Sequence, residues 1–351
     1  MQKKEKIIIV LCVIATLVSG VLHFAEALPV ITFAATGVAL ALLAMIVGDA
    51  TEQLGSRLGP GATGVLQSGL GNLPELFVAI FALRAGLDHV VQAALVGSIL
   101  GNSLLVFGLA LFLGGLKNGT QRFRSEPPRM IATLMLLAVS ALIIPTLAKT
   151  LHSPAEPYIN RLDIVVAVIL LVVFAASIYF SIKGDPAVAP QESEMGHAAW
   201  SMGLTIGVLA GSGVGAALVA DWFVEALQPA MQTLGISETF AGLVIVAIAG
   251  NAIENLIGVQ LAWRNQADYA VSVILNSSLQ IALGLFPILL LLSFVLGGAV
   301  LTFVLSPLLI VALLLASLVS AFVVFDGESI WLEGLALVGL YCIIAAAFWW
   351  G

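Results

Sequence analysis

Two glutamates in long apolar stretches are the residues of this sequence best suited to chemistry. Each closes a similar motif, Gly-Asn-Leu-Pro-Glu at 71–75 and Gly-Asn-Ala-Ile-Glu at 250–254. A charged group at the centre of a membrane-spanning helix costs about 2.5–3.5 kcal/mol, so such residues are usually functional. Asn72 and Glu75, like Asn251 and Glu254, are three residues apart and share a helix face. Each motif therefore presents a cluster of oxygen atoms.

A second layer of neutral polar residues follows each motif. In the first copy Ser98 and Asn102 are four residues apart; in the second, Asn276 and Gln280 have the same spacing, with Ser277 beside them. Residues four apart share a helix face, so each set offers amide and hydroxyl oxygens in one direction. We expect these residues to join the glutamates at one site.

Oxygen-only ligands suit a hard cation, and Ca²⁺ takes six to eight of them at about 2.3–2.6 Å. The two motifs contain no Cys or His, which makes zinc and copper poor candidates. Two carboxylates would neutralise one divalent ion; without it, two close buried carboxylates would repel each other and take up protons. Calcium and protons would therefore compete for the same oxygens. The alternative is that the glutamates only hold helices together by hydrogen bonds.

Four further acidic residues lie at the ends of predicted helices. Asp49 and Glu52 end the second apolar stretch, and Asp221 and Glu225 end the seventh. They are predicted to form acidic mouths that attract cations, or else to be ordinary charges at helix ends.

The elements that position these residues are membrane-spanning helices. Of the 351 residues 61% are hydrophobic and 9% are charged, against roughly 25% charged in a soluble domain, so a soluble fold is excluded. The apolar runs are long enough for a hydrocarbon core of about 30 Å and lack the alternation of barrel strands. The sequence predicts an all-α integral membrane protein with about eleven transmembrane helices, at 7–25, 30–58, 61–86, 90–115, 129–149, 160–182, 199–226, 236–263, 268–296, 300–323 and 329–350.

The positive charges predict the orientation. With the amino terminus in the cytoplasm, ten of the 13 Lys and Arg residues fall inside and three outside, in agreement with the positive-inside rule. The first run, with three lysines before it and Ala-Glu-Ala at 25–27 after it, also resembles a signal peptide. We interpret it as a retained helix and expect a multi-pass protein of the plasma (inner) membrane.

The second half of the chain repeats the first at an offset of 179 residues. This alignment places Ser98 on Ser277 and Phe107 on Phe286, in addition to the two glutamate motifs. It predicts an N-terminal helix at 1–28, five-helix repeats at 29–182 and 199–351, and an acidic cytoplasmic linker at 183–198. Because five is odd, the second repeat would be inverted, an arrangement typical of secondary transporters with a site between discontinuous helices.

The paired Gly-Asn-x-x-Glu motifs and the polar motifs Gly97-Ser98-x-x-Gly101-Asn102 and Asn276-Ser277-Ser278-x-Gln280 resemble the calcium/proton antiporter (CAX) family, bacterial type, of the calcium/cation antiporter superfamily. The resemblance covers essentially the whole chain. It implies two inverted repeats, with Glu75 and Glu254 as the essential glutamates of a central calcium site. The sodium/calcium exchanger branch typically has Gly-Thr/Ser-Ser-x-Pro-Glu/Asp, so the Gly-Asn pair favours protons, although Pro74 is shared with the sodium branch. The linker carries only three acidic residues, which makes a long acidic regulatory helix unexpected.

We therefore predict a secondary transporter, not an enzyme, that exchanges Ca²⁺ for H⁺ by alternating access and extrudes cytoplasmic calcium. A sodium/calcium exchanger on the same scaffold is the alternative, and a cation channel is a third. The sequence contains no recognised motif of an intramembrane enzyme. No cofactor is expected, because Ca²⁺ is the transported substrate. The expected partners are Ca²⁺, H⁺ and the lipid bilayer, without nucleic acid, and a homo-oligomer is left open.

Overall fold

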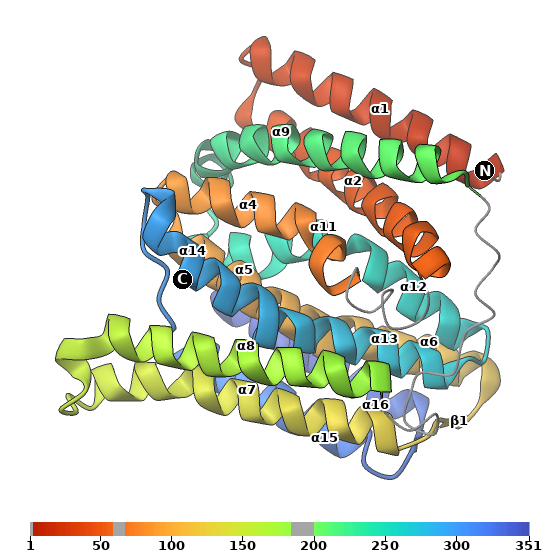
Figure 1. The fold of residues 1–351 in the computed structure, drawn as a ribbon, viewed down its shortest axis with the longest axis vertical. Coiled ribbons are helices and arrows are strands. Elements are labelled where there is room, and N and C mark those ends of the chain that lie inside the picture. Colours follow the sequence, from red (N-terminus) through yellow and green to blue (C-terminus); the bar gives the residue numbers. More distant parts are fainter. Residues whose placement is uncertain (1–2, 59–66, 184–199, 351) are drawn as a thin grey trace.

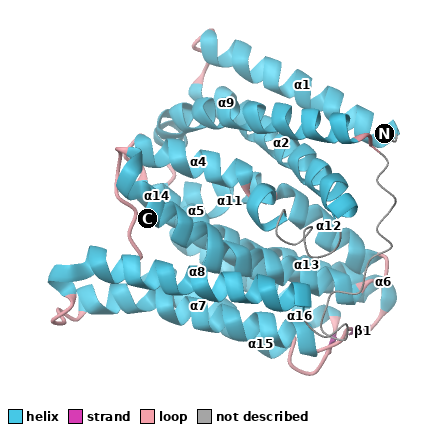
Figure 2. Cartoon of the chain, viewed as in Figure 1, coloured by secondary structure: helices cyan, strands magenta, loops and turns pink. Residues whose placement is uncertain are grey.

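The computed structural model describes residues 3–58, 67–183 and 200–350, except the side chains of residues 3–4, 58, 67–68, 181–183 and 252–255. Most of these residues are helical (Figures 1 and 2). The α-helices are α1 (Lys3–Phe24), α2 (Pro29–Leu58), α4 (Leu73–Arg84), α5 (Asp88–Leu100), α6 (Phe107–Asn118), α7 (Glu126–Thr150), α8 (Ile159–Lys183), α9 (Met202–Leu234), α10 (Glu238–Phe240), α11 (Ala247–Gly250), α12 (Ala252–Trp263), α13 (Ala267–Gln280), α14 (Phe286–Leu296), α15 (Pro307–Val323) and α16 (Trp331–Phe348).

Shorter elements join these helices. Four are π-helical turns: η1 (Gln67–Gly71), η2 (Gly101–Val106), η4 (Ala241–Val246) and η5 (Ile281–Leu285). The 3₁₀ turn η3 (Glu156–Tyr158) precedes α8. Strands β1 (Gln121–Arg122) and β2 (Glu328–Ser329) pair antiparallel between two loops.

Among the described residues, eight continuous helical stretches are long and apolar enough to cross a membrane. They are Glu5–Phe24, Pro29–Arg57, Asp88–Asn118, Glu126–Thr150, Glu156–Phe180, Met202–Leu234, Ala267–Leu296 and Trp331–Phe348. Shorter apolar helices lie at Glu238–Gly250 and Pro307–Val323. The predicted helical architecture with several apolar spans is thus confirmed.

Several helix boundaries differ from the predicted spans. The spans expected at 61–86 and 236–263 are interrupted at Asn72 and Asn251. α9 continues beyond the predicted end at 226, because it passes through Pro229 and stops only at Gly235, whose φ of 64° is left-handed. α15 begins at Pro307 rather than at 300, because Ser306 caps it and the residues before it are extended.

The helices α1, α2 and α9 form one layer of the molecule (Figure 1). α2 and α9 pack along each other in the most extensive helix contact, and α1 packs mainly on α2. α4 contacts α9 and α12 contacts α2, so the two helices that carry the glutamates join this layer to the rest. On the other side, α8 packs on α14, α7 on α13 and α15, and α16 on α6.

The connections between helices gather at two faces of the molecule. We call the face where α1 begins the near face; it lies on the right in Figure 1 and includes the α6–α7 and α15–α16 loops. The far face, on the left, includes the α1–α2, α4–α5 and α7–α8 turns. The glutamate motifs lie between these faces.

Candidate cation site

Asn72 and Asn251 interrupt the helical conformation of the chain just before the two short helices that carry the glutamates. Their backbone angles are nearly the same, φ −91° and ψ 19° at Asn72 and φ −93° and ψ 21° at Asn251. These angles fall in the sparsely populated bridge region, where many active-site residues sit. The break expected at each Gly-Asn pair is therefore present. Glu75 and Glu254 each lie in the first turn of a new helix, α4 and α12.

The side chain of Glu75 packs against the backbone of Gly250. A Cβ atom at Gly250 would lie 2.7 Å from Glu75 Cγ and 3.0 Å from Glu75 Oε1. Only glycine therefore leaves room for this carboxylate, and the first glutamate lies against the residue just before the second break. The side chain of Glu254 lies outside the described residues, so only its backbone position in α12 is given.

Amide and hydroxyl groups from both halves of the chain form a buried hydrogen-bond network. Asn251 Nδ2 donates to Ser98 Oγ at 2.7 Å. Asn102 Nδ2 donates to Ser277 Oγ at 2.9 Å and to Asn251 Oδ1 at 3.4 Å. Asn102 and Asn251 are each 1% exposed, so these bonds satisfy polar groups that water cannot reach. The first polar layer therefore bonds directly to the second motif.

Three further neutral residues were singled out in the sequence, namely Asn72, Asn276 and Gln280. Asn72 Nδ2 is 3.5 Å from Gln280 Oε1, a long bond that links the first break to α13. Asn276 is exposed, in contrast to its neighbour Ser277, which is buried. Four of the seven neutral residues singled out in the sequence thus form one network, and Asn72 and Gln280 form a second contact.

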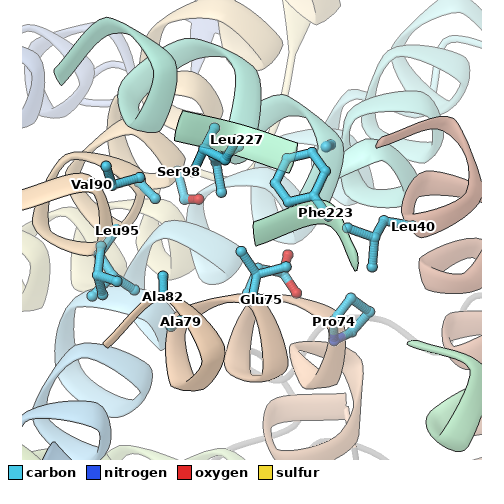
Figure 3. Close-up of a pocket in the computed structure, with 16 residues that line it drawn as sticks. Leu40, Pro74, Glu75, Ala79, Ala82, Val90, Leu95, Ser98, Phe223 and Leu227 are labelled. Atoms are coloured by element: carbon cyan, nitrogen blue, oxygen red, sulfur yellow. The ribbon is translucent and has the colours of Figure 1, made fainter. Parts of the chain in front are cut away.

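Glu75 lines a pocket that extends from the network towards the far face. In Figure 3 its side chain rises from α4 among the labelled residues Leu40, Phe223 and Ser98. The pocket is narrow, because only about 30 Å³ of it can hold the centre of a water molecule. Apart from Glu75 and Ser98 its walls are apolar, with side chains from α2, α4, α5, α9 and the second motif region. Within this pocket, Glu75 and Ser98 are the lining residues whose side chains offer oxygen atoms to a cation.

The four predicted mouth residues lie on α2 and α9, at opposite ends of the helix pair. Asp49, which is partly buried, and the exposed Glu52 lie towards the near-face end of α2. Asp221 and Glu225 lie towards the far-face end of α9, where Glu225 Oε2 is 3.6 Å from His23 Nδ1. The two acidic pairs thus lie in opposite halves of the same helix layer.

Two features of the structure were not predicted from the sequence. The contact between Gly250 and Glu75 joins positions that are distant in the sequence, and no local sequence pattern predicts it. Asp163 of α8 is completely buried, and its Oδ2 accepts a hydrogen bond from the Phe303 N–H at 3.4 Å. A signal for Asp163 was available, because it is the one acidic residue in the predicted span 160–182.

This arrangement suits a hard cation better than a transition metal. The described residues provide one carboxylate, Glu75, close to buried amide and hydroxyl groups. Among the residues with described side chains, no group of three or more His, Cys, Asp or Glu could hold a metal. A site of few carboxylates completed by neutral oxygens is typical of calcium, whereas zinc and copper favour nitrogen and sulfur ligands.

Comparisons with known proteins agree with this chemistry. The family model for the sodium/calcium exchanger protein matches residues 28–183 and 204–350. A Ca²⁺/H⁺ antiporter of Synechocystis sp. is 36% identical and covers 99% of this chain and 98% of its own length. The Ca²⁺/H⁺ antiporter ChaA of Bacillus subtilis is 34% identical over 95% of each chain. The solved structure of native YfkE superposes with a TM-score of 0.84, at 30% identity, over 97% of this chain and 99% of that one.

Proposed function

This chain belongs to the sodium/calcium exchanger protein family, with Ca²⁺/H⁺ antiporters among its relatives, and from that premise we propose that it exchanges Ca²⁺ for H⁺. The resemblance to calcium/proton antiporters, expected from the paired motifs, is confirmed. The observation in the structure that best supports the exchange is the position of Glu75. Its carboxyl group lies against the second motif, next to a buried layer of neutral oxygens.

In the proposed mechanism, Glu75 and Glu254 share one ion. Both glutamates begin half-helices that follow the same backbone break, so their carboxylates would approach the network from the two halves of the chain. With Ca²⁺ bound, two carboxylates neutralise the double charge. When the ion leaves, each carboxylate takes up a proton, because two close buried charges of one sign repel each other. The two cargoes therefore cannot occupy the site together.

The neutral residues would have two roles at this site. Ser98, Asn102, Asn251 and Ser277 bond to one another, so they can hold the site in shape when it is empty of Ca²⁺. Their oxygens, and those of Asn72, Asn276 and Gln280, are our candidates for the remaining ligands. Asp49, Glu52, Asp221 and Glu225 would raise the local concentration of cations at the two faces.

The proposed topology contains eleven spans, with an N-terminal helix followed by two inverted five-helix repeats. Eight of these spans are the long apolar helices, and the two interrupted segments and the short α15 would be the other three. The distribution of Lys and Arg would place the near face in the cytoplasm and the far face outside the inner membrane. With a proton gradient directed inwards, calcium would be extruded by alternating access of the site to the two faces.

Proton-driven flux in vesicles tests this function. The purified chain should take up Ca²⁺ into vesicles when a proton gradient is imposed, and Glu75→Gln and Glu254→Gln should each abolish the uptake, because an amide cannot exchange a proton for the ion. Glu328→Gln is the matched control, since Glu328 is exposed and its ion pair in the described structure is with exposed Arg122 at 3.5 Å. Full activity in either site variant would rule out the assignment.

Sodium coupling is the second candidate, because the family model covers sodium/calcium exchangers and Pro74 is shared with that branch. A sodium gradient imposed with the proton gradient collapsed separates the two. A proton antiporter stays silent under this condition, whereas a sodium exchanger moves calcium.

A further inference from the structure

Residues 297–306, which we call the strap, connect α14 to α15 across the far face without forming a helix. Leu301, Phe303 and Leu305 are 0%, 0% and 3% exposed, while the residues between them are more exposed. This alternation is that of an extended strand. Buried N–H and C=O groups need hydrogen-bond partners, and no strand pairs with this segment in the described structure.

Side chains from four helices take the place of a neighbouring strand. The N–H groups of the three buried residues donate to Ser293 Oγ of α14 at 3.0 Å, to Asp163 Oδ2 of α8 at 3.4 Å and to Thr146 Oγ1 of α7 at 2.9 Å. Alternate residues of a strand direct their polar groups to the opposite side, where Gln92 Nε2 of α5 donates to Thr302 O at 2.9 Å and to Val304 O at 3.2 Å. The strap is therefore held from both sides.

The beginning of the strap caps the helix that carries Glu75. The N–H of Ala299 donates to Leu83 O at 2.9 Å, in the last turn of α4. A Cβ atom at Gly298 would lie 2.3 Å from the same carbonyl oxygen, so the strap approaches the helix end as closely as the backbone allows. The last carbonyls of a helix have no partner within the helix. The strap thus fixes the end of α4 opposite to Glu75.

The near face has a corresponding arrangement at the helix that carries Glu254. Lys117 Nζ donates to Trp263 O at 3.1 Å, and Asn118 Nδ2 donates to Ala262 O at 3.2 Å. These residues end α6, in the first half of the chain, and they cap the last turn of α12, in the second half. Each helix that carries a glutamate is therefore held, at the end opposite to the glutamate, by a segment from the other half of the chain.

We propose that Gln92 and Asp163 are positioning residues of the cation site. They hold the strap, the strap holds the end of α4, and the fixed helix keeps Glu75 in place against Gly250. α4 has only 12 residues, about 18 Å, so movement at one end is carried to the other. Neither residue touches the ion in this scheme. The inference rests on the proposed exchange of Ca²⁺ for H⁺ at Glu75.

The test compares substitutions that remove a strap bond with one that keeps it. Gln92→Leu and Asp163→Leu replace each polar group by an apolar side chain of similar size, whereas Asp163→Asn retains an oxygen that can accept the Phe303 N–H. Gln228→Leu is the matched control, because Gln228 is an exposed glutamine in the far-face half of α9. Calcium uptake is measured in vesicles, and hydrogen exchange by mass spectrometry is measured on each full-length chain in detergent.

In both leucine variants we expect faster hydrogen exchange in residues 73–84 and 297–306. We also expect the calcium concentration that gives half-maximal flux to rise roughly tenfold, and the maximal flux to fall by less than that. Asp163→Asn and Gln228→Leu should stay within about twofold of the unaltered chain. Unchanged exchange in 73–84 in a folded Gln92→Leu protein would overturn the proposal, as would a loss of maximal flux alone. If Asp163→Leu fails to fold, Gln92→Leu still decides.

A chain without proton-driven flux would instead count against the proposed function, and the hydrogen-exchange data would still show whether the strap holds α4.

Discussion

Gly250 shows how one residue can serve two purposes in this site. Its lack of a side chain weakens the helix before Asn251, and it also leaves the space that the Glu75 carboxylate occupies. The residue therefore couples the break in one half of the chain to the position of the glutamate in the other.

Gly250→Ala tests this coupling. The added Cβ atom would meet Glu75 Cγ at 2.7 Å and displace the carboxylate, so we expect proton-driven calcium flux to fall roughly tenfold or more, as misplaced reactive groups do. Gly211→Ala on α9 is the control, since its Cβ atom would meet nothing within 4 Å. Equal flux in both variants would mean that Glu75 does not depend on Gly250.

Asn251 is the residue with most bonds in the polar network. Asn251→Ala removes its bonds to Ser98 and Asn102 and leaves buried polar groups without those partners, which costs about 1–3 kcal/mol for each unsatisfied group. We expect a lower unfolding temperature in detergent and weaker calcium binding by titration calorimetry. Ser140→Ala is the control, because the Ser140 hydroxyl is exposed and bonds only within its own helix. A variant as stable as the control would contradict a structural role for the network.

At the scale of elements, the short helices α4 and α12 depend on their neighbours for position. An isolated helix of 12 residues is marginal in stability, so packing and capping must hold it. Close helix crossings supply much of this packing. α6 and α16 approach through Gly108 and Gly334, and small residues of this kind permit tight contact between helices in membranes.

Gly334→Ala tests the crossing of α6 and α16. The new Cβ atom would lie 2.3 Å from Phe112 N and 2.6 Å from Gly108 O, and backbone atoms cannot move aside as side chains can. We expect a loss of about 1–3 kcal/mol in stability, typical of overpacking, seen as a lower unfolding temperature in detergent. Gly339→Ala on the same helix has no atom within 4 Å of the added carbon and should unfold like the unaltered chain. If both variants unfold alike, the crossing is looser than the structure indicates.

At the scale of the whole molecule, the layer of α1, α2 and α9 carries one acidic pair in each half, and the candidate site lies between this layer and the remaining helices (Figure 1). The proposed alternating access would have this layer and the remaining helices move relative to each other. The extensive contact between α2 and α9 favours movement of these two helices together.

The proposed orientation can be measured by cysteine labelling. In a chain whose Cys12 and Cys342 are replaced by serine, a cysteine at Ser153 in the α7–α8 turn should react with an impermeant reagent in intact cells. A cysteine at Asn265, in the α12–α13 turn, should react only after the cells are permeabilised, because loops that carry more Lys and Arg face the cytoplasm. The reverse pattern would invert the topology and with it the proposed direction of calcium transport.

Composition and local motifs alone were enough to predict the helical membrane class and to locate both glutamate motifs. Hydrophobic length and composition set the first, because a bilayer requires long apolar helices. The breaks at Asn72 and Asn251 were also predictable, since Gly and Asn act locally on the backbone. The assignment of calcium ligands stays a prediction at every residue.

Which of these residues meet depends instead on how the helices pack in three dimensions. The bond from Asn251 to Ser98, the contact of Gly250 with Glu75 and the bond from Phe303 to Asp163 all join positions more than 100 residues apart. Such contacts follow from how helices cross and from where an extended segment is buried. Periodicity and local backbone preference carry no information on either, because they describe each helix separately from its neighbours.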